Sequence, residues 1–269
     1  MANQFTHPWK KEEMLFLINN FNKLSYKELG HRINKSYASI QSKIRNAKLN
    51  KRISKHPINS NFFKAWSSEM AYVLGFITAD GNLQQIKQGY HLHIACDDYD
   101  IIEKIKKTLQ SSTPIRNKMR FNGKISYSLR FSDKFIFKDL MELGVTPRKS
   151  LIIRPPSIPR KYVWAYIRGF FDGDGCVYIS KTTRYPSKLH TLFYTGSLHM
   201  AQFLFHTISK YLKKYGGNIM KKKGKNAYVL HFGQKHSEAI FHYMYTNATI
   251  FMDRKYNIFL KGIMQNESK

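Results

Sequence analysis

The most constraining feature of the sequence is an internal repeat at an offset of 94 residues. Residues 71–81 read AYVLGFITADG and residues 165–175 read AYIRGFFDGDG, so six of the eleven aligned positions are identical. Self-similarity of this kind indicates two copies of one structural unit, and the period is longer than that of a solenoid array. We therefore expect the main body of the chain to consist of two related halves.

Each repeated segment predicts an apolar helix with a small residue at every fourth position. Gly75 and Ala79 hold these places in the first copy, and Gly169 and Gly173 hold them in the second. Small residues at this spacing let two helix backbones approach closely, for purely steric reasons. We therefore expect the two helices to pack directly on each other.

Both predicted helices end at an Asp-Gly pair, Asp80-Gly81 and Asp174-Gly175. Glycine suits the left-handed residue that often terminates a helix, which places each aspartate at the tip of its helix. Crossing the helices brings Asp80 and Asp174 together near the negative ends of both dipoles, where two carboxylates repel each other. A divalent cation would resolve this repulsion.

Oxygen-only ligands suit magnesium or calcium rather than zinc. Magnesium usually takes one or two carboxylates together with substrate phosphates, and metals in such sites activate water and stabilise the leaving oxygen. The aspartate pair therefore predicts phosphodiester hydrolysis with magnesium, for which manganese or calcium can substitute in binding.

The net charge indicates the class of partner. Lys and Arg outnumber Asp and Glu by 45 to 17, and the resulting +28 implies a polyanionic partner. No apolar run approaches the roughly 20 residues of a membrane span. Residues 1–13 also lack the layout of a signal peptide, so we expect an intracellular protein with no membrane partner. Cys96 and Cys176 are expected to be buried thiols rather than a disulfide or zinc ligands.

Residues 1–49 predict a small helical module. Apolar residues recur at helical spacing in three short blocks, and Ser25 with Glu28 fits a capping box at the start of the second block. A third helix over residues 36–47 would bury two isoleucines, Ile40 and Ile44. Its exposed residues would be Tyr37, Ser39, Gln41, Lys43 and Arg45.

Three short helices with a basic third helix resemble the Myb-like and resolvase-like helix-turn-helix modules, whose third helix enters the major groove. A helical bundle with a solvated basic face is the other interpretation. Residues 1–60 contain twelve Lys or Arg and three Asp or Glu, which favours DNA binding. Residues 50–61 then read as a basic linker.

Alternating residues after the first repeated helix predict a two-faced sheet. Residues 115–121 and 125–131 place apolar side chains on one face and basic or polar ones on the other, and Asn122-Gly123 predicts the hairpin turn between them. The second copy is less regular and has three lysines at 221–223. A basic sheet face can lie in the DNA major groove, although a solvated charged face is the other interpretation. Because the two halves of the protein differ, they suit a DNA site that is not palindromic.

The repeated segments resemble the paired motifs of the LAGLIDADG homing endonucleases, in which the eighth motif residue is the metal-binding acid. Asp80 and Asp174 hold that place, while Thr78 departs from the family's usual acid at the sixth position. The resemblance covers roughly residues 62–265. It implies an α+β fold in which two pseudo-symmetric αββαββα repeats, residues 62–154 and 155–269, form a DNA-binding saddle behind the N-terminal helix-turn-helix.

The resemblance also implies further site residues. The family has a basic residue near the end of each half, and Lys149 and Lys255 are the matching candidates. Gly81 and Gly175 join the aspartates in the predicted metal site, and Asp98 is a candidate for its edge. The residues predicted to contact DNA are Tyr37, Ser39, Gln41, Lys43, Arg45, Lys87, Arg116, Lys118, Arg120, Arg130 and Lys222.

The implied function is that of a monomeric, intron-encoded endonuclease. Such an enzyme cuts double-stranded DNA at a long asymmetric site and leaves short 3′ overhangs. Two alternatives use the same scaffold without this activity: a DNA-binding regulator that does not cleave, and a maturase that binds intron RNA. The presence of both Asp80 and Asp174 favours the nuclease over a non-catalytic scaffold.

Overall fold

The computed structural model describes residues 8–21, 24–47, 49, 56–86, 89–180, 187–212, 217–224 and 226–267. The chain divides into two compact units, Met1–Pro57 and Ile58–Lys269. Each unit has its own hydrophobic core, a small one in the first and a large one in the second. Within the described ranges, no helix has the length and apolarity needed to cross a membrane.

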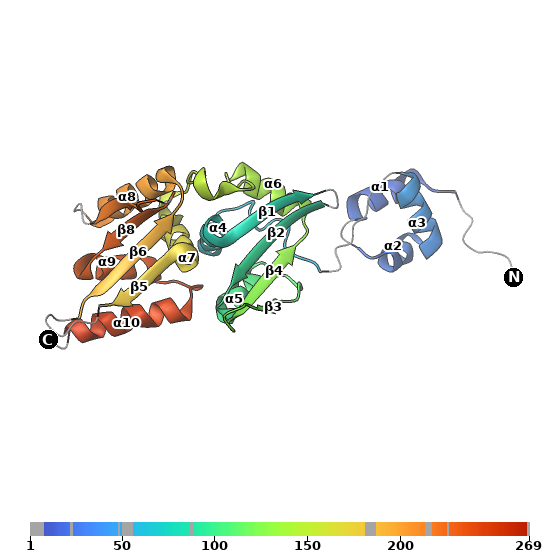
Figure 1. The fold of residues 1–269 in the computed structure, drawn as a ribbon. Helices are drawn as coiled ribbons and strands as arrows, with labels where there is room; N and C mark the ends of the chain where they lie inside the picture. The colour runs from blue at the N-terminus through green and yellow to red at the C-terminus, as the bar shows by residue number, and fades with distance from the viewer. Residues whose placement is uncertain are drawn as a thin grey trace. The chain divides into compact units, whose positions relative to one another are not determined.

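The N-terminal unit contains α1 (Lys11–Asn20), α2 (Tyr26–Ile33) and α3 (Tyr37–Asn46) (Figure 1). The predicted capping box is confirmed at the start of α2. The hydroxyl of Ser25 accepts a 3.1 Å hydrogen bond from the backbone N–H of Glu28, and the Glu28 carboxylate accepts one of 2.7 Å in return. Ile40 and Ile44 are buried in the core of this unit, as predicted.

The second unit contains two copies of an αββαββα repeat, as the sequence predicted (Figure 1). The first copy consists of α4 (Ser68–Asp80), β1 (Gly81–Ile86), β2 (Gly89–Cys96), α5 (Tyr99–Thr108), β3 (Arg116–Met119), β4 (Ile125–Phe131) and α6 (Lys134–Glu142). The second consists of α7 (Val163–Asp174), β5 (Gly175–Ile179), β6 (Leu189–Thr195), α8 (Leu198–Leu212), β7 (Asn218–Lys221), β8 (Tyr228–Phe232) and α9 (Gln234–Tyr245). A further helix, α10 (Asp253–Glu267), follows the second copy.

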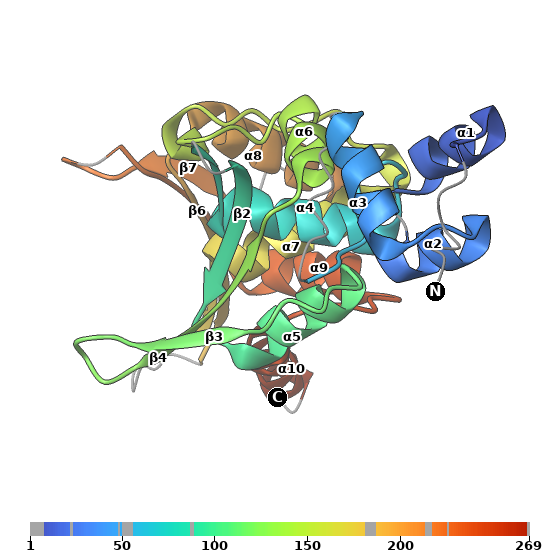
Figure 2. The ribbon, with the colours of Figure 1, turned by 90° about the vertical axis from the view of Figure 1, so that its right-hand side faces the viewer.

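Each repeat carries a four-stranded antiparallel sheet. The strand orders are β1-β2-β4-β3 and β5-β6-β8-β7, so equivalent strands occupy equivalent places. Helices α5 and α6 pack on the first sheet, and α8, α9 and α10 pack on the second. Figure 2 shows the helices on one side of the strands, with the β3–β4 and β7–β8 hairpins extending away from them. The other face of each sheet is therefore open, as a DNA-binding saddle requires.

Helices α4 and α7 pack directly on each other at the centre of the second unit (Figure 2). A Cβ atom added to Gly75 would lie 2.1 Å from the carbonyl oxygen of Tyr166, and one added to Gly169 would lie 1.9 Å from that of Tyr72. Two non-bonded atoms cannot approach so closely. The two backbones are therefore in contact, which confirms the packing predicted from the small residues.

The prediction that a left-handed glycine terminates each motif helix is wrong. Gly81 has φ −76° and ψ 145°, and Gly175 has φ −98° and ψ 163°, so both are extended. The reason is that each helix leads directly into a strand, β1 or β5, without an intervening turn. Space is what requires glycine, because added Cβ atoms would lie 2.6 Å and 2.5 Å from the carbonyl oxygens of Ile77 and Phe171.

We predict that Gly169→Ala lowers the free energy of unfolding by about 1–3 kcal/mol or more, because the added methyl forces the two helices apart. Denaturant unfolding of the full chain would measure the change. Gly233→Ala is the matched control, since a Cβ there meets nothing within 4 Å. Equal stability of the two variants would contradict direct backbone contact between α4 and α7.

Candidate active site

Asp80 and Asp174 lie close together where α4 and α7 end. An added Cβ at Gly173 would lie 2.4 Å from the Cβ of Ala79 and 3.5 Å from the carboxyl carbon of Asp80. The last turn of α7 is therefore against the last turn of α4, and the aspartates are the next residues of both helices. The structure thus brings the two predicted site residues together from sequence positions 94 residues apart.

The two carboxylates occupy a partly buried site that disfavours their negative charge. Burial, followed by the charge of Asp174, raises the pKa of Asp80 to about 6, against the opposing effect of two nearby lysines. Burial also raises the pKa of Asp174. A divalent cation bound by both would favour their ionised forms, and carboxylate oxygens are ligands that magnesium and calcium prefer. The donor set therefore fits such a cation.

Lys149 and Lys255 lie against the ends of the two motif helices, with exposed fractions of 5% and 4%. The Nζ of Lys149 donates a 2.5 Å hydrogen bond to the carbonyl oxygen of Gly81. In the other half, the Nζ of Lys255 donates a 2.7 Å hydrogen bond to the carbonyl oxygen of Gly175. Each ammonium thus caps the negative end of a helix dipole, at equivalent places in the two repeats.

The environment of these lysines couples them to the aspartates. Burial lowers the pKa of Lys149, and Asp174 followed by Asp80 opposes that effect. Burial also lowers the pKa of Lys255, with Asp172 the main opposing charge. Gly81 and Gly175 were predicted to join the metal site, but their backbone carbonyl oxygens accept hydrogen bonds from these lysines. The carboxylates of the site come from the two aspartates.

A buried polar network that sequence reasoning missed holds the end of α7. Tyr72 of the first repeat donates a 2.6 Å hydrogen bond to Oδ2 of Asp172, and the backbone N–H of Met252 donates to the same oxygen at 2.9 Å. Burial raises the pKa of Asp172 to about 6, against the opposing charge of Lys255. Asp172 therefore joins α4, α7 and the segment that precedes α10.

Arg168 is a second buried charge in α7. Its Nε donates a 3.0 Å hydrogen bond to the carbonyl oxygen of Ile250, and its Nη1 donates to that of Met244. The repeat alignment contained a signal for this residue, because Leu74 stands at the equivalent place of α4. A charged residue that occurs in only one of two aligned apolar helices indicates that only its own half of the protein supplies a polar partner for it.

Asp98, the candidate for the edge of the site, is engaged elsewhere. Its carboxylate accepts hydrogen bonds of 3.0 Å from both Nε and Nη2 of Arg254, the residue before Lys255. Among the described residues, no group of three or more His, Cys, Asp or Glu side chains is arranged to hold a metal. The candidate site therefore consists of the Asp80 and Asp174 carboxylates, with Lys149 and Lys255 beside them.

The two cysteines differ from the prediction of buried thiols. Cys96 and Cys176 are half-buried and form no disulfide. Cys176 precedes the buried Val177 in β5, so strand alternation turns it to the sheet face that the helices leave open. Cys96 is the last residue of β2, and burial raises the pKa of its thiol to about 11.

The predicted DNA-contacting residues of the first sheet lie on its open face. Arg116 and Lys118 on β3 are paired with serines of β4. Arg130 on β4 is paired with His93 of β2. Paired residues project from the same face of a sheet, and on β4 the two serines and Arg130 alternate with the buried Leu129 and Phe131. One face of this sheet is therefore basic, as the alternation predicted.

The remaining predicted sheet contacts differ in their surroundings. Arg120 forms a 2.8 Å ion pair with Asp97, which partly neutralises its charge. Lys222 of the second sheet places its Nζ 4.9 Å from the centre of the Tyr194 ring. Lys87 lies outside the described residues.

The apolar face of the β3–β4 hairpin is buried only in the part away from the tip. Leu129 and Phe131 are buried, whereas Met119, Phe121 and Ile125 are exposed. The hairpin continues past the helices that cover the sheet, so its distal residues have no helix to pack against (Figure 2). The turn itself is as predicted, with Gly123 at φ +76°.

In the N-terminal unit, the five predicted contact residues of α3 are not equally accessible. Ser39 and Lys43 are partly buried rather than exposed. Ser39 lies in the first turn, where its N–H donates to the side chain of Ser36, and Lys43 places its Nζ 5.4 Å from the centre of the Trp9 ring. Three residues are exposed as predicted: Tyr37, Gln41 and Arg45.

Comparison with known protein families assigns the two repeats. The LAGLIDADG endonuclease model matches residues 167–263, and the WhiA LAGLIDADG-like domain model matches residues 69–141. The second of these matches lies within the first structural repeat, whereas the first begins in α7 and continues past the second repeat into α10, and each includes most of one motif helix. The fold and the paired aspartates define a double-motif protein, and the chain belongs to the LAGLIDADG family.

Two related proteins come from Methanocaldococcus jannaschii. MJ0398 is 26% identical over 239 residues, which cover 81% of this chain and 79% of that protein. MJ0314 is 25% identical over 154 residues, which cover 56% of this chain and 55% of that protein. The chain therefore matches about half the length of MJ0314 and most of the length of MJ0398.

Solved structures with the same fold include two homing endonucleases. I-WcaI bound to its DNA recognition sequence has a TM-score of 0.51 and 15% identity, over 78% of this chain and 93% of that one. I-LtrWI bound to target DNA has a TM-score of 0.50 and 14% identity, over 78% of this chain and 92% of that one. At such identities the similarity establishes the fold of the second unit.

We predict that Arg168→Leu lowers the free energy of unfolding by about 3–5 kcal/mol. The buried carbonyl oxygens of Ile250 and Met244 would lose their charged donor, and the buried Asp172 would lose a nearby positive charge. The double variant Arg168→Leu with Asp172→Thr, which introduces the residues that the first repeat carries, should recover part of this loss. Leu74→Met is the control and should cost less than about 1.5 kcal/mol. If the second substitution adds to the loss, the two buried charges do not compensate each other.

Proposed function

We propose that this protein is a magnesium-dependent endonuclease that cleaves double-stranded DNA at a long asymmetric site and leaves short 3′ overhangs. The observation that carries the proposal is the convergence of Asp80 and Asp174, one from each repeat, where α4 and α7 end. Because one chain supplies both carboxylates, we infer that it acts as a monomer. An intron-encoded origin and an intracellular location would suit such an enzyme.

In this proposal the residues of the site have separate tasks. Asp80 and Asp174 would hold the cation, and a bound magnesium would activate water and stabilise charge on the scissile phosphate. Lys149 and Lys255 fix the ends of the motif helices through the carbonyl groups of Gly81 and Gly175. Their positive charges also favour the ionised aspartates, and their buried, hydrogen-bonded positions are set before substrate binds.

Binding of the duplex would depend on the open, basic faces of the sheets. The net charge of +28 supports a phosphate-rich partner, and the I-WcaI structure of the same fold is bound to its DNA recognition sequence. Arg116, Lys118 and Arg130 on the first sheet are proposed to contact DNA. The exposed residues of α3 would add contacts in the manner of a helix-turn-helix recognition helix.

A second candidate function is binding of DNA without cleavage. The first repeat matches a domain described as WhiA LAGLIDADG-like, whereas the second matches the endonuclease model. A regulator would use the same basic sheets and N-terminal helices. The two candidates differ in one outcome, the production of DNA ends in the presence of magnesium.

We predict that Asp80→Asn and Asp174→Asn each reduce magnesium-dependent double-strand cleavage by on the order of a hundredfold or more, while DNA binding is retained. Sequencing of the ends released from a randomised duplex library would measure cleavage, and a mobility shift would measure binding. The matched control is Glu103→Gln, which changes a carboxylate on the outer helix α5. Cleavage by either aspartate variant at the rate of the parent chain would refute the site.

We predict that Arg45→Ala weakens binding and reduces the slope of log affinity against log salt by about 0.9, because one phosphate contact is lost. Titration of the full-length chain with the selected duplex at several salt concentrations gives the slope. Lys107→Ala is the control, because it removes an equal charge from α5, the helix that covers the face of the first sheet opposite to the open face. This variant should leave the slope unchanged. An unchanged slope for Arg45→Ala would exclude this residue of α3 from the DNA contact.

A further inference from the structure

The tip of the β3–β4 hairpin presents apolar side chains to solvent. Phe121 is fully exposed, Met119 is 71% exposed and Ile125 is 41% exposed. These residues are neighbours in the hairpin, since Met119 is paired with Ile125 and Phe121 begins the turn. An exposed apolar cluster at a projecting tip indicates a surface that contacts a partner.

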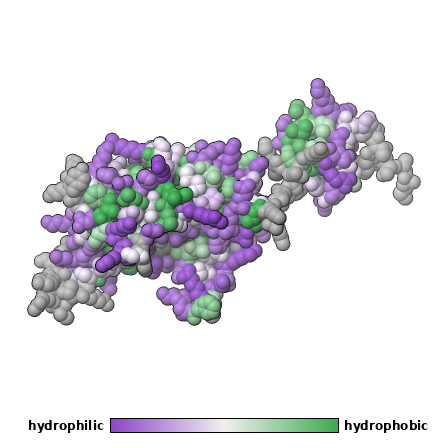
Figure 3. Space-filling view, turned by 45° about the horizontal axis from the view of Figure 1, so that its top comes forward, coloured by the Kyte–Doolittle hydropathy of each residue, from purple (hydrophilic) through white to green (hydrophobic). Residues whose placement is uncertain are grey.

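The surroundings of this tip are basic. Arg116, Lys118 and Lys124 are exposed on the same hairpin. In Figure 3 a projection at the lower edge ends in hydrophobic surface and is otherwise hydrophilic, as expected for this hairpin. Charge complementarity therefore favours a polyanion that also offers apolar groups. Duplex DNA does so in the major groove, where the 5-methyl group of thymine is the apolar group on the base edges.

The open sheet face beside the tip is hollowed. A hollow of about 780 Å³ is lined by small residues, including Ala95, Ser126 and Ser128, together with Lys118, Met119 and Phe121. The small side chains leave room for a group that projects from the groove. The apolar lining would contact a methyl group while the basic residues contact phosphates.

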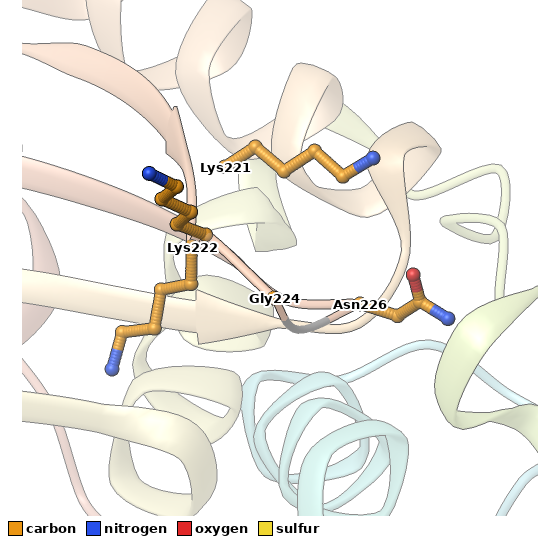
Figure 4. Close-up of a pocket in the computed structure, with 5 residues that line it drawn as sticks. Lys221, Lys222, Gly224 and Asn226 are labelled. Atoms are coloured by element: carbon orange, nitrogen blue, oxygen red, sulfur yellow. The ribbon is translucent and has the colours of Figure 1, made fainter.

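The equivalent hairpin of the second repeat has a different chemistry. A hollow of about 450 Å³ at the β7–β8 tip is lined by Lys221, Lys222, Lys223, Gly224 and Asn226 (Figure 4). The side chains of Lys221, the last residue of β7, and Lys222, the next residue, point in different directions (Figure 4). Ammonium groups bind phosphates as point charges, and phosphate contacts carry no base information.

We propose that the two hairpin tips recognise the two outer flanks of the DNA target by different means. Phe121 reads thymine methyl groups in the flank bound by the first repeat. Lys221, Lys222 and Lys223 hold the phosphates of the opposite flank whatever its sequence. This inference rests on the proposed DNA function, and it adds which flank carries sequence information and through which chemical group.

The two kinds of contact have different measurable consequences. Burying one methyl group against an apolar side chain changes affinity by about fourfold, and the change does not depend on salt. Losing one lysine contact to a phosphate weakens binding to all sequences and reduces the log–log salt slope by about 0.9. Substitutions at the two tips should therefore be distinguishable in one set of titrations.

The test begins with selection of bound duplexes from a randomised library, using the full-length Asp80→Asn chain so that bound DNA is not cut. We expect thymine to be enriched in one outer flank and no base to be enriched in the other. Adding Phe121→Ala should remove the thymine preference and keep the rest of the motif. Met220→Ala, at a partly exposed apolar residue of the opposite hairpin, is the matched control and should change nothing.

Replacing the selected thymines by uracil then removes the methyl groups alone. Affinity should fall about fourfold for each contacted methyl in the parent chain and should not change in the Phe121→Ala variant. Lys222→Ala should weaken all duplexes and lower the salt slope. Because Phe121 is fully exposed, its variant should unfold at the parent temperature, which shows that folding is not affected.

Any one of these results would overturn the inference: no thymine preference in either flank, a preference that survives Phe121→Ala, or equal affinity for thymine and uracil duplexes. Each of these leaves the proposed nuclease intact, because cleavage is measured separately. Failure to enrich any duplex would instead refute DNA binding, and with it both the proposed function and this inference. Uniform weakening of all duplexes by Phe121→Ala would also overturn the inference, since it indicates a backbone contact.

Discussion

The rest of the structure depends on the direct contact between the backbones of α4 and α7. Gly75 and Gly169 allow this contact, since a methyl group at either position would overlap a carbonyl oxygen of the facing helix. The helices are equivalent elements of the two repeats, so the residues that both share, the aspartates among them, lie at the same distance from the contact in each helix. The aspartates follow one turn beyond the contact and therefore arrive together. The sheets follow the aspartates and extend to either side.

Charge accumulates at this contact because both helices end there. Two carboxylates lie at the negative ends of two helix dipoles, in surroundings that raise the pKa of both. Lys149 and Lys255 supply part of the compensation and are themselves buried. Burying charges in this way costs stability unless each is paired. This costly arrangement, repeated in both halves, is consistent with the proposed site for a cation and a phosphate.

The two repeats share a topology but differ in chemistry. In α7, Arg168 and Asp172 connect the helix to Tyr72 and to the segment before α10, whereas the equivalent residues of α4 are Leu74 and Thr78. The additional helix α10 explains part of this difference, because it begins where Met252 and Lys255 meet α7. The hairpin tips differ too, one apolar and the other basic. Equal scaffolds with unequal surfaces are suited to a partner without twofold symmetry.

The sequence by itself determined the features that repeat or are local. The 94-residue offset gave the two halves, the small residues gave the helix contact, and the capping box and the Asn-Gly turn gave local structure, because each depends on near neighbours or on a period. Only the tertiary structure decided which distant groups meet. Lys149 reaches the carbonyl of Gly81 across 68 residues, and Lys255 reaches that of Gly175 across 80. The exposed hairpin tip and the extended glycines were likewise decided by where the covering helices end and where the next strand begins, which no local pattern records.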